Sequence, residues 1–519
     1  MKSLSSKEYK NEFVNSFPGD DSGNLSPRQT PGVLYSKAMP TPVANPSLLA
    51  WSEELANELG IQKPNHPNDV AILGGNYVAP TMQPYAACYA GHQFGNWAGQ
   101  LGDGRAITLG EWQTTAGTSW ELQLKGAGRT PYSRRADGRA VLRSSVREYL
   151  MSEAMHYLGV PTTRALSLVT TGDQVLRDMF YNGNPAYEPG AIVMRVAPSF
   201  LRFGNFELLA SRRENQHLRQ LADWTISRYY PHLQGEDKYL QWFREVRDRT
   251  ASLMVEWLRV GFVHGVMNTD NMSVLGLTID YGPYSFVDDY DLNFTPNTTD
   301  LPGRRYAFGK QASVAYWNLG CFASAIAPLF SGTEELVKEL EAYADIYSAY
   351  YLKMMGNKLG LDQVKAEDIS LVTKFDETLA ALKPDMTIFY QLLIDLPLHL
   401  TDEQELTAYF SESYYTPLTE AQATLLAGVL KEYIARIQQN TCSREESQQR
   451  MREHNPRFVL RNYLLSLAIE ELEKGENTLF LQLQEAIKTP YSTDHDKFFV
   501  KRPDWATSKA GCSMLSCSS

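Results

Sequence analysis

Cysteine and histidine are scarce in this chain of 519 residues, and neither forms a recognisable metal-binding pattern. The nine histidines are dispersed, and no Cys-x-x-Cys pair occurs. The five cysteines, an odd number, are Cys88, Cys321, Cys442, Cys512 and Cys517. No zinc site at the usual ligand spacing is therefore predicted. The scattered cysteines also exclude a disulfide framework, so a reducing compartment is expected.

Long apolar runs are missing as well, and so is a targeting segment. No apolar stretch reaches the roughly 18 residues of a transmembrane helix, so none is expected. Residues 1–19 mix lysine and glutamate without an apolar centre, unlike a secretory signal or a transit peptide. We therefore expect a cytoplasmic protein, in preference to a mitochondrial one, with no membrane partner.

Basic residues are outnumbered, because 49 Lys and Arg against 60 Asp and Glu give a net charge of −11. A protein that binds nucleic acid through bulk electrostatics is basic, so we expect no nucleic-acid partner. The remaining composition, 43% hydrophobic and 21% charged, is typical of globular proteins. The length indicates about two to four domains or lobes at roughly 150 residues each. We expect a monomer.

The apolar pattern changes along the chain from strand-like to helical. The first 200 residues contain strand candidates at 106–112, 119–124, 165–170 and 191–196, with one helix at 145–158. From about 214 the spacing is helical. Helices are predicted at 238–260, 311–328, 333–356, 376–396, 419–440 and 456–474. This order predicts an α+β fold.

The most informative stretch lies in the middle of the chain. His264 to Asn271 reads His-Gly-Val-Met-Asn-Thr-Asp-Asn, and Asp280-Tyr-Gly begins nine residues after Asn271. The apolar run between them suits a β-hairpin that would return Asp280 to Asn271. Kinase-like enzymes hold Mg²⁺ with such an Asn and Asp, because Mg²⁺ takes oxygen ligands and keeps substrate phosphates in its shell. Both stretches are also ordinary turn sequences, and alone the two interpretations are about equally good.

A lysine at the end of a strand gives a second signal. Lys125 follows the strand at 119–124 and precedes Gly-Ala-Gly, while Glu148 lies on the next helix. A strand lysine paired with a helix glutamate points an ammonium group at nucleotide phosphates. The alternative is a capping box, Ser145-Val-Arg-Glu148, in which Glu148 reaches back to the start of its helix. We favour the ion pair, because Lys125 on a half-buried strand needs a partner.

Glycines and embedded arginines indicate an anionic ligand. Gly102-Asp-Gly104-Arg105 lies between a loop and a strand, where glycines let backbone N–H groups approach phosphate oxygens. A single Gly-x-Gly is by itself weak, since most are turns. Arg195 and Arg202 lie inside apolar stretches, where a charge must be paired. In an acidic protein, such arginines fit an anionic ligand.

Together these stretches resemble the selenoprotein O family of kinase-like protein adenylyltransferases. The resemblance spans about 80 to 460. The matching stretches are Tyr89-Ala-Gly-His-Gln-Phe-Gly95, Gln100-Leu-Gly-Asp-Gly-Arg105, Leu124-Lys-Gly-Ala-Gly128, Pro131-Tyr-Ser133, Asp137-Gly-Arg-Ala-Val-Leu-Arg-Ser-Ser145, His264-Gly265, Asn268-Thr-Asp-Asn271, Asp280-Tyr-Gly-Pro283 and Asn455-Pro-Arg457. The resemblance implies a two-lobed protein-kinase-like fold with a mostly helical C-terminal lobe and extension. It also implies transfer of AMP from flipped ATP to Ser, Thr or Tyr hydroxyls of protein substrates, with release of pyrophosphate and Mg²⁺ or Mn²⁺ as cofactor.

The resemblance further implies a role for each matched residue. Asp270 would be the base for the acceptor hydroxyl, whereas Asn271 and Asp280 would hold the metal. The residues implied to line, contact or support the nucleotide are Gly102, Gly104, Arg105, Lys125, Asp137, Gly138, Glu148, Arg195, Arg202 and Asp280. In ordinary kinases the base lies five residues before the Asn, whereas Asp270 is adjacent to Asn271.

We accordingly predict five parts of the chain. They are an N-terminal arm (1–45), an N-lobe-like nucleotide-binding region (46–205), a C-lobe core with the catalytic loop and metal site (206–330), a helical extension (331–500) and a flexible cysteine-containing tail (501–519).

Several alternatives remain open at this point. A conventional kinase, acting on a protein or a small molecule, would use every residue named, and a nucleotide-binding pseudokinase scaffold would need no base. The family places a selenocysteine or cysteine at the position of Cys517, which some relatives pair with a cysteine after Asp-Tyr-Gly. Here that segment, Asn293-Phe-Thr-Pro-Asn297, has none. A redox role for Cys512 or Cys517 therefore stays open.

Overall fold

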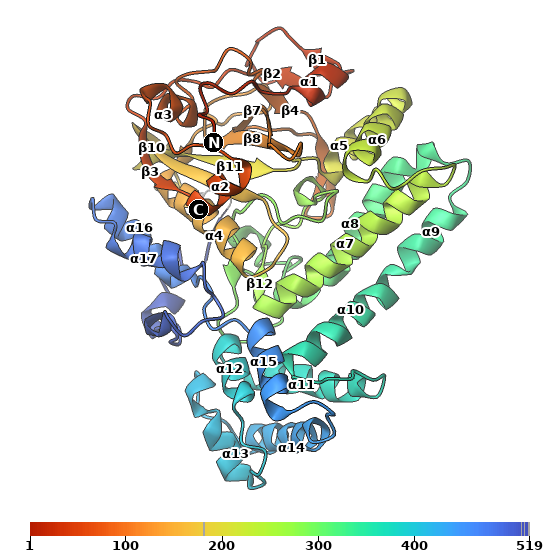
Figure 1. Ribbon diagram of the computed structural model, residues 1–519, viewed down its shortest axis with the longest axis vertical. Coiled ribbons are helices and arrows are strands. Elements are labelled where there is room, and N and C mark those ends of the chain that lie inside the picture. Colours follow the sequence, from red (N-terminus) through yellow and green to blue (C-terminus); the bar gives the residue numbers. More distant parts are fainter. Residues whose placement is uncertain (180–181, 510, 513, 517–519) are drawn as a thin grey trace.

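The sheet-containing part of the molecule lies at the top of Figure 1. It belongs to a computed structural model that describes residues 1–179, 182–509, 511–512 and 514–516. The described residues form a nine-stranded mixed sheet in the order β1-β2-β4-β7-β8-β11-β10-β3, with β9 pairing to β11. Only β1 and β2 pair in parallel within it. The strands are β1 (Gly19–Asp20), β2 (Tyr35–Lys37), β3 (Ser47–Trp51), β4 (Tyr85–Ala87), β7 (Ala106–Gln113), β8 (Ser119–Lys125), β9 (Ala140–Val141), β10 (Arg164–Arg177) and β11 (Ala186–Ala197).

All four predicted strands are present, and two are longer than the sequence indicated. The segments 165–170 and 191–196 are the buried portions of β10 and β11, which continue as a partly exposed hairpin. Those outer portions carry polar residues that the apolar pattern could not register. Three short helices accompany the strands: α1 (Glu12–Ser16), α2 (Glu53–Leu59) and α3 (Pro67–Leu73).

Helix α4 (Leu142–Tyr157) crosses the sheet and begins three residues earlier than predicted. Its N-cap is Val141, so Ser145 lies inside the first turns and the capping-box alternative for Glu148 is wrong. The early start follows from β9, which ends at Val141 and leads directly into the helix. Leu150, Met151 and Ala154 are buried in the core beneath β10 and β11.

The helical part begins with α5 (Phe203–Ser211), α6 (Asn215–Tyr229) and α7 (Lys238–Val260), the last with its predicted bounds. Helix α7 ends at Gly261, whose φ of 79° closes the helix in the left-handed region. Strand β12 (Phe262–Val263) follows immediately and pairs with β13 (Ser285–Phe286). This pair brackets the catalytic-loop candidate between residues 264 and 284.

The predicted C-terminal helices are present, but several are broken or supplemented. The segment 333–356 breaks at Ala342, and 376–396 breaks at Lys383, which has a φ of 50°. The helices are α8 (Gln311–Ile326), α9 (Glu334–Glu341), α10 (Tyr343–Lys358), α11 (Asp368–Leu382), α12 (Met386–Ile394), α13 (Glu403–Tyr409), α14 (Glu420–Ile437), α15 (Arg444–His454), α16 (Asn462–Glu473) and α17 (Thr478–Ala486).

Two apolar clusters organise these helices. Helices α11 to α15, at the bottom of Figure 1, enclose one core together with residues of α7, β12 and α10. Helices α16 and α17 instead return to the sheet, where Gln484 donates hydrogen bonds to the Trp51 carbonyl (3.3 Å) and the Tyr149 hydroxyl (3.1 Å). The sheet and the C-terminal helices α16 and α17, which are far apart in the sequence, therefore share the core around α4.

The run 272–279 does not form the predicted β-hairpin. Ser273 bridges to Arg202, and Thr278 bridges to Thr162. The segment makes one turn of its own, from Gly276 N to the Ser273 carbonyl, and forms its other bridges with residues that flank the sheet. A hairpin does form elsewhere, from β5 (Ala90–Gln93) and β6 (Asn96–Gln100), in the glycine-dense region.

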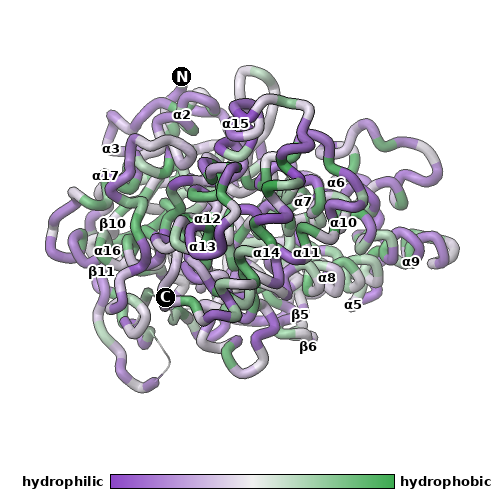
Figure 2. Tube along the Cα trace, turned by 90° about the horizontal axis from the view of Figure 1, so that it is seen from below, coloured by the Kyte–Doolittle hydropathy of each residue, from purple (hydrophilic) through white to green (hydrophobic). Residues whose placement is uncertain are grey.

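The loops at the outline of the molecule are mostly hydrophilic, whereas apolar stretches concentrate inside (Figure 2). Within the described ranges, no helix combines the length and the apolar character needed to cross a bilayer.

Candidate active site

Lys125, the last residue of β8, forms an ion pair with Glu148 of α4. Its Nζ lies 2.8 Å from Glu148 Oε2, and both side chains are almost fully buried. Burial lowers the pKa of Lys125, whereas Glu148 favours its charged form. Glu148 Oε1 also lies 3.2 Å from Arg195 Nη1, so one carboxylate orients two cations.

Asp280 is held between the two arginines that the sequence places in apolar stretches. Arg195 Nη1 lies 2.6 Å from Asp280 Oδ1, and Arg202 Nη1 lies 2.6 Å from Oδ2. Burial alone would raise the pKa of Asp280, but Arg202, Arg195 and Lys125 hold it well below its usual value. Asp280 therefore stays ionised. Its φ of 57° is uncommon for a non-glycine residue, and such strain recurs at functional sites.

Asp270 lies on a 3-10 turn, η1 (Thr269–Asn271), beside this cluster. Its Oδ2 accepts a hydrogen bond from Gln93 Nε2 at 3.1 Å, whereas Oδ1 is buried and has no hydrogen-bond partner among the described residues. Burial raises the pKa of Asp270 to about 7, against the hydrogen bond from Gln93 and the charge of Arg202. A carboxylate in this state accepts a proton near neutral pH.

A glycine makes room for this carboxylate. A Cβ on Gly91 would lie 2.7 Å from Asp270 Oδ1, closer than real side chains approach. Arg202 adds a second restraint, because its Nη1 donates to the Asp270 carbonyl at 2.8 Å. One arginine therefore connects the backbone of the catalytic loop to Asp280.

Asn271 is oriented by the same loop. Its Nδ2 donates to the Val266 carbonyl at 2.9 Å, which leaves Oδ1 as a ligand atom. His264 Nε2 lies 2.8 Å from the Ile279 carbonyl, and burial lowers the His264 pKa. The neutral imidazole therefore donates to that carbonyl and fixes the segment that ends at Asp280.

Three supporting residues were not singled out from the sequence. Gln93 holds the Asp270 carboxylate, the Tyr306 hydroxyl donates to Asn268 Oδ1 at 2.7 Å, and Asn318 Nδ2 donates to the Met267 carbonyl at 3.0 Å. Gln93 lies within the matching stretch Tyr89–Gly95, which was the available signal. Tyr306 and Asn318 carry no local motif, because their roles arise only from tertiary contact.

Gly102 and Gly104 lie against the turn at 130–133. A Cβ on Gly102 would meet the Tyr132 ring at 2.5 Å, and one on Gly104 would meet the Tyr132 carbonyl at 2.9 Å. Their lack of a side chain therefore permits close packing of this turn. Arg105 is half-buried and has no ion-pair partner in the described part of the chain.

Asp137 and Gly138 lie at the far side of the Gly126–Gly128 stretch. Asp137 is paired with Arg177, at 2.7 Å and 2.8 Å from its two oxygens. A Cβ on Gly138 would come within 2.1 Å of the Gly128 carbonyl, so Gly138 permits the close approach of two backbones. Within the described residues, Asp137 pairs with Arg177 and makes no hydrogen bond or ion pair with Asp280, unlike Arg195 and Arg202.

The C-terminal tail reaches the segment after Asp280. Leu515 N donates to the Pro296 carbonyl and Thr298 N donates to the Leu515 carbonyl, both at 2.8 Å. Cys512 is a buried free thiol, and burial raises its pKa. Cys517 lies outside the described residues.

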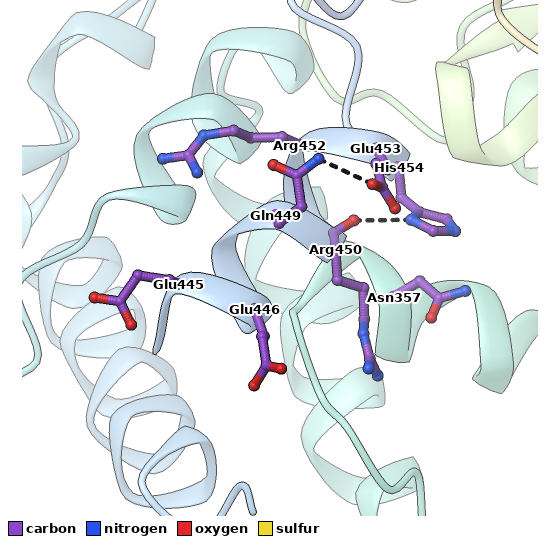
Figure 3. A pocket seen from close by; sticks show the side chains of 8 residues that line it. All are labelled: Asn357, Glu445, Glu446, Gln449, Arg450, Arg452, Glu453 and His454. Atoms are coloured by element: carbon purple, nitrogen blue, oxygen red, sulfur yellow. Dashed lines mark hydrogen bonds between the residues drawn. The ribbon is translucent and has the colours of Figure 1, made fainter. Parts of the chain in front are cut away.

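A large surface pocket of about 640 Å³ lies far from these residues along the chain. It is lined by Asn357 and the α15 side chains shown in Figure 3. Gln449 donates to Glu453 at 2.9 Å, and His454 lies 2.8 Å from the Arg450 carbonyl. The pocket contains none of the residues predicted for the site.

Comparison with known proteins gives one consistent result. Residues 28–488 match the family model described as "Protein adenylyltransferase SelO". The chain is 63% identical to a "Protein nucleotidyltransferase YdiU" of Cytophaga hutchinsonii over 519 residues, which are 100% of both chains. It is 49% identical to the protein of that name in Nitrosospira multiformis (98% of this chain, 96% of the relative) and 51% identical to that of Aromatoleum aromaticum (98% and 99%).

Proposed function

The chain belongs to the SelO family of protein adenylyltransferases, and we propose that it transfers AMP from ATP to hydroxyl side chains of proteins. The single observation that carries the proposal is the convergence of Arg195 and Arg202 on Asp280, beside Asp270 and Asn271, with Lys125 joined to Arg195 through Glu148. These residues come from two strands, a helix, a helix N-cap, a 3-10 turn and a loop. We assign the chain a two-lobed kinase-like fold with the site between the sheet and the helices.

The cationic side of the site suits a polyphosphate. Lys125, Arg195 and Arg202 supply three positive charges, and Glu148 and Asp280 supply the buried negative charges that hold them in place. Guanidinium groups bind phosphate oxygens with two parallel N–H donors. Arg105, which has no ion-pair partner in the described chain, adds a further cation near Lys125.

The oxygen donors suit Mg²⁺ or Mn²⁺. Asn271 Oδ1 is left available by the bond of its Nδ2 to Val266, and each Asp280 oxygen keeps a lone pair beyond its arginine contact. Two protein oxygens are enough, because such ions complete their shell with substrate phosphates and water. When bound, the metal ion neutralises charge on the phosphates.

The transfer step needs a base at the acceptor hydroxyl. Asp270 Oδ1, buried and without a hydrogen-bond partner among the described residues, accepts the acceptor proton. The acceptor oxygen then bonds to the α-phosphorus of ATP, and the bond from that phosphorus to pyrophosphate breaks. Arg195, Arg202 and Lys125 stabilise the charge that develops on the departing pyrophosphate. Binding of ATP with its α-phosphate toward Asp270, the flipped orientation, gives AMP transfer.

The mass of the transferred group shows in which orientation ATP binds. The protein is incubated with ATP and Mg²⁺ or Mn²⁺, and intact protein and peptides are analysed by mass spectrometry beside Asp280→Ala. Self-modification by an adenylyl mass, absent in the variant, is the expected result. A phosphate-sized gain would instead establish a kinase with ATP in the ordinary orientation. No gain on the protein or on a mixture of acceptor proteins would favour a nucleotide-binding scaffold.

A further inference from the structure

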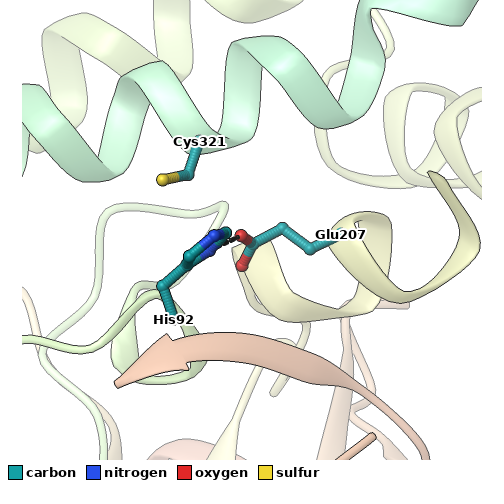
Figure 4. A group of neighbouring side chains, drawn as sticks. All are labelled: His92, Glu207 and Cys321. Carbon is teal, nitrogen blue, oxygen red and sulfur yellow. Dashed lines mark hydrogen bonds and ion pairs between the residues drawn. The ribbon is translucent and has the colours of Figure 1, made fainter. Parts of the chain in front are cut away.

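Three side chains with metal-ligand atoms meet on the opposite flank of the catalytic loop. His92 comes from β5, Glu207 from α5 and Cys321 from α8. One imidazole nitrogen, one carboxylate oxygen and Sγ all lie within 4.8 Å of one another. Figure 4 shows the imidazole between the α5 carboxylate and the α8 thiol. These residues are 115 and 114 positions apart along the chain, so no local spacing could have revealed them.

The carboxylate in this group is buried and only partly satisfied. The Glu207 side chain is 3% exposed, and its Oε1 lies 2.6 Å from His92 Nδ1. Among the described residues its Oε2 is buried and has no partner at full hydrogen-bond geometry. Burial raises the Glu207 pKa, whereas the nearby Thr269 hydroxyl and His92 lower it. A buried carboxylate oxygen without a partner is costly, and a cation is one group that would satisfy it.

The chemistry of the three donors selects the class of ion. Imidazole, thiolate and carboxylate together suit a transition metal such as Zn²⁺ and differ from the all-oxygen donors of Asn271 and Asp280. A surface pocket of about 420 Å³, lined by His92, Cys321, Trp317 and neighbours on α8, reaches the same place and supplies an entry path. Three protein ligands leave a fourth tetrahedral position open to that pocket.

We propose that His92, Glu207 and Cys321 form a binding site for a zinc-class divalent ion. Binding breaks the Cys321 S–H bond, the proton goes to solvent, and the sulfur bonds to the metal with no change of oxidation state. Burial raises the pKa of the free Cys321 thiol to about 12, so this proton is still present before binding. Metal binding normally overcomes such a pKa by displacing the proton.

Packing alone offers a competing explanation for His92. Its ring contacts Trp97 and Trp317, with centroids 5.0 Å and 5.4 Å away, and its Nδ1 is bonded to Glu207. A packed histidine of this kind requires neither the thiol of Cys321 nor an unsatisfied Glu207 oxygen. The participation of sulfur is therefore the property that separates the two explanations.

The site lies next to the catalytic loop. The His92 backbone N–H donates to Thr269 Oγ1 at 2.7 Å, and the next residue, Gln93, donates to Asp270. An ion held by β5, α5 and α8 would fix the β5–β6 hairpin beside Asp270. Binding itself is independent of the proposed function and is measured without ATP.

Cobalt is a suitable probe, because Co²⁺ bound to a thiolate gives a near-ultraviolet charge-transfer band. Metal-stripped full-length protein is titrated with Co²⁺ in the absence of nucleotide. We expect the band to saturate at about one equivalent and to disappear when Zn²⁺ is added. Co²⁺ at Asn271 and Asp280 gives no such band, since these ligands contain no sulfur. Cys321→Ser should abolish the band, whereas the matched control Cys442→Ser, another half-buried thiol, should keep it.

A second measurement uses the unaltered chain and avoids any folding defect of a variant. Alkylation of Cys321 and Cys442 is followed by peptide mass spectrometry with and without Zn²⁺. Slower alkylation of Cys321 alone, by about tenfold or more, supports the site. Equal alkylation rates, or a cobalt band that survives in Cys321→Ser, would overturn it. Neither result depends on whether the protein transfers AMP.

Discussion

Two buried networks in this molecule are both built from ion pairs between basic side chains and carboxylates. They differ in backbone strain and in the exposure of their central aspartate. The first, which we call the open network, consists of Asp103, Lys125, Glu148, Arg195, Arg202 and Asp280. The second, the closed network, consists of Asp288, Asp385, Tyr415, Arg461 and Arg502. Asp280 of the open network and Asp288 of the closed network are only eight positions apart along the chain.

The closed network satisfies its buried aspartate completely. The Asp385 side chain is 0% exposed, caps α12 through the Ile388 N–H (3.1 Å), and accepts from Arg461 (2.9 Å) and the Tyr415 hydroxyl (2.7 Å). Its φ is −61°, which is unstrained for an N-cap. Arg461 also binds Asp288, and Arg502 joins from the C-terminal segment. These contacts secure the segment after Asp280 to α12 and α16.

The open network leaves its aspartate in a different state. The Asp280 side chain is 23% exposed, and its backbone has a φ of 57°. A network that only stabilised the fold would require neither the backbone strain nor the exposure of its central aspartate. The difference teaches that strain and partial exposure of a charged side chain, rather than ionic content, mark the network built to receive a ligand.

The largest effect on activity is expected at Asp270, in the catalytic loop beside the open network. Asp270→Ala should lower AMP transfer by about 10²–10⁴-fold, the usual contribution of a positioned base. Nucleotide binding should change little, because Asp270 contributes its backbone carbonyl rather than its carboxylate to Arg202. Transfer rates and nucleotide affinity are measured in parallel. Transfer near the wild-type rate would remove Asp270 from the role of base.

A substitution in the closed network should lower the stability of the fold rather than the rate of AMP transfer. Arg461→Ala leaves Asp385 and Asp288 buried without their main partner, which should lower the free energy of unfolding by about 3–5 kcal/mol. Urea unfolding monitored by tryptophan fluorescence provides the value. The folded fraction should keep the wild-type response to nucleotide. A loss below about 1 kcal/mol would mean that the closed network does not carry the stability assigned to it.

The metal dependence of nucleotide binding should be lost by a substitution in the open network and kept by one in the closed network. For the wild-type protein, ATP with Mg²⁺ or Mn²⁺ at about 100 times the dissociation constant should add about 2.7 kcal/mol of stability. In Asp280→Ala the arginines still attract polyphosphate, but the shift should no longer differ between metal and chelator. Unchanged metal dependence would show that Asp280 is not a ligand. Arg461→Lys, with the charge retained in the closed network, is the matched control.

Part of the fold and part of the open network could be predicted from the sequence. The order of strands and helices and the Lys125–Glu148 pair followed from period, strand position and the rule that buried charges are paired. The same rule assigned Arg195 and Arg202 to an anionic ligand, and their pairing with Asp280 was not predicted. The run 272–279 was misread as a hairpin, because its apolar pattern does not say which backbone it pairs with. The His92–Glu207–Cys321 group joins residues more than 100 positions apart, and Arg461 and Asp385 of the closed network are 76 positions apart, so only the packed chain shows these contacts.

The smallest effect is expected from removing one hydroxyl of the closed network. Tyr415→Phe removes the hydroxyl that donates to Asp385 Oδ2 at 2.7 Å and accepts from the Arg502 N–H at 3.2 Å, and it leaves the ring against Arg502. The Asp385 carboxylate keeps Arg461 and the α12 N–H, so the free energy of unfolding should fall by about 1 kcal/mol. Urea midpoints of the variant and wild type, at equal m-values, measure this change. A fall as large as that of Arg461→Ala would show that the network acts as one cooperative unit, and AMP transfer per folded molecule should remain that of the wild type.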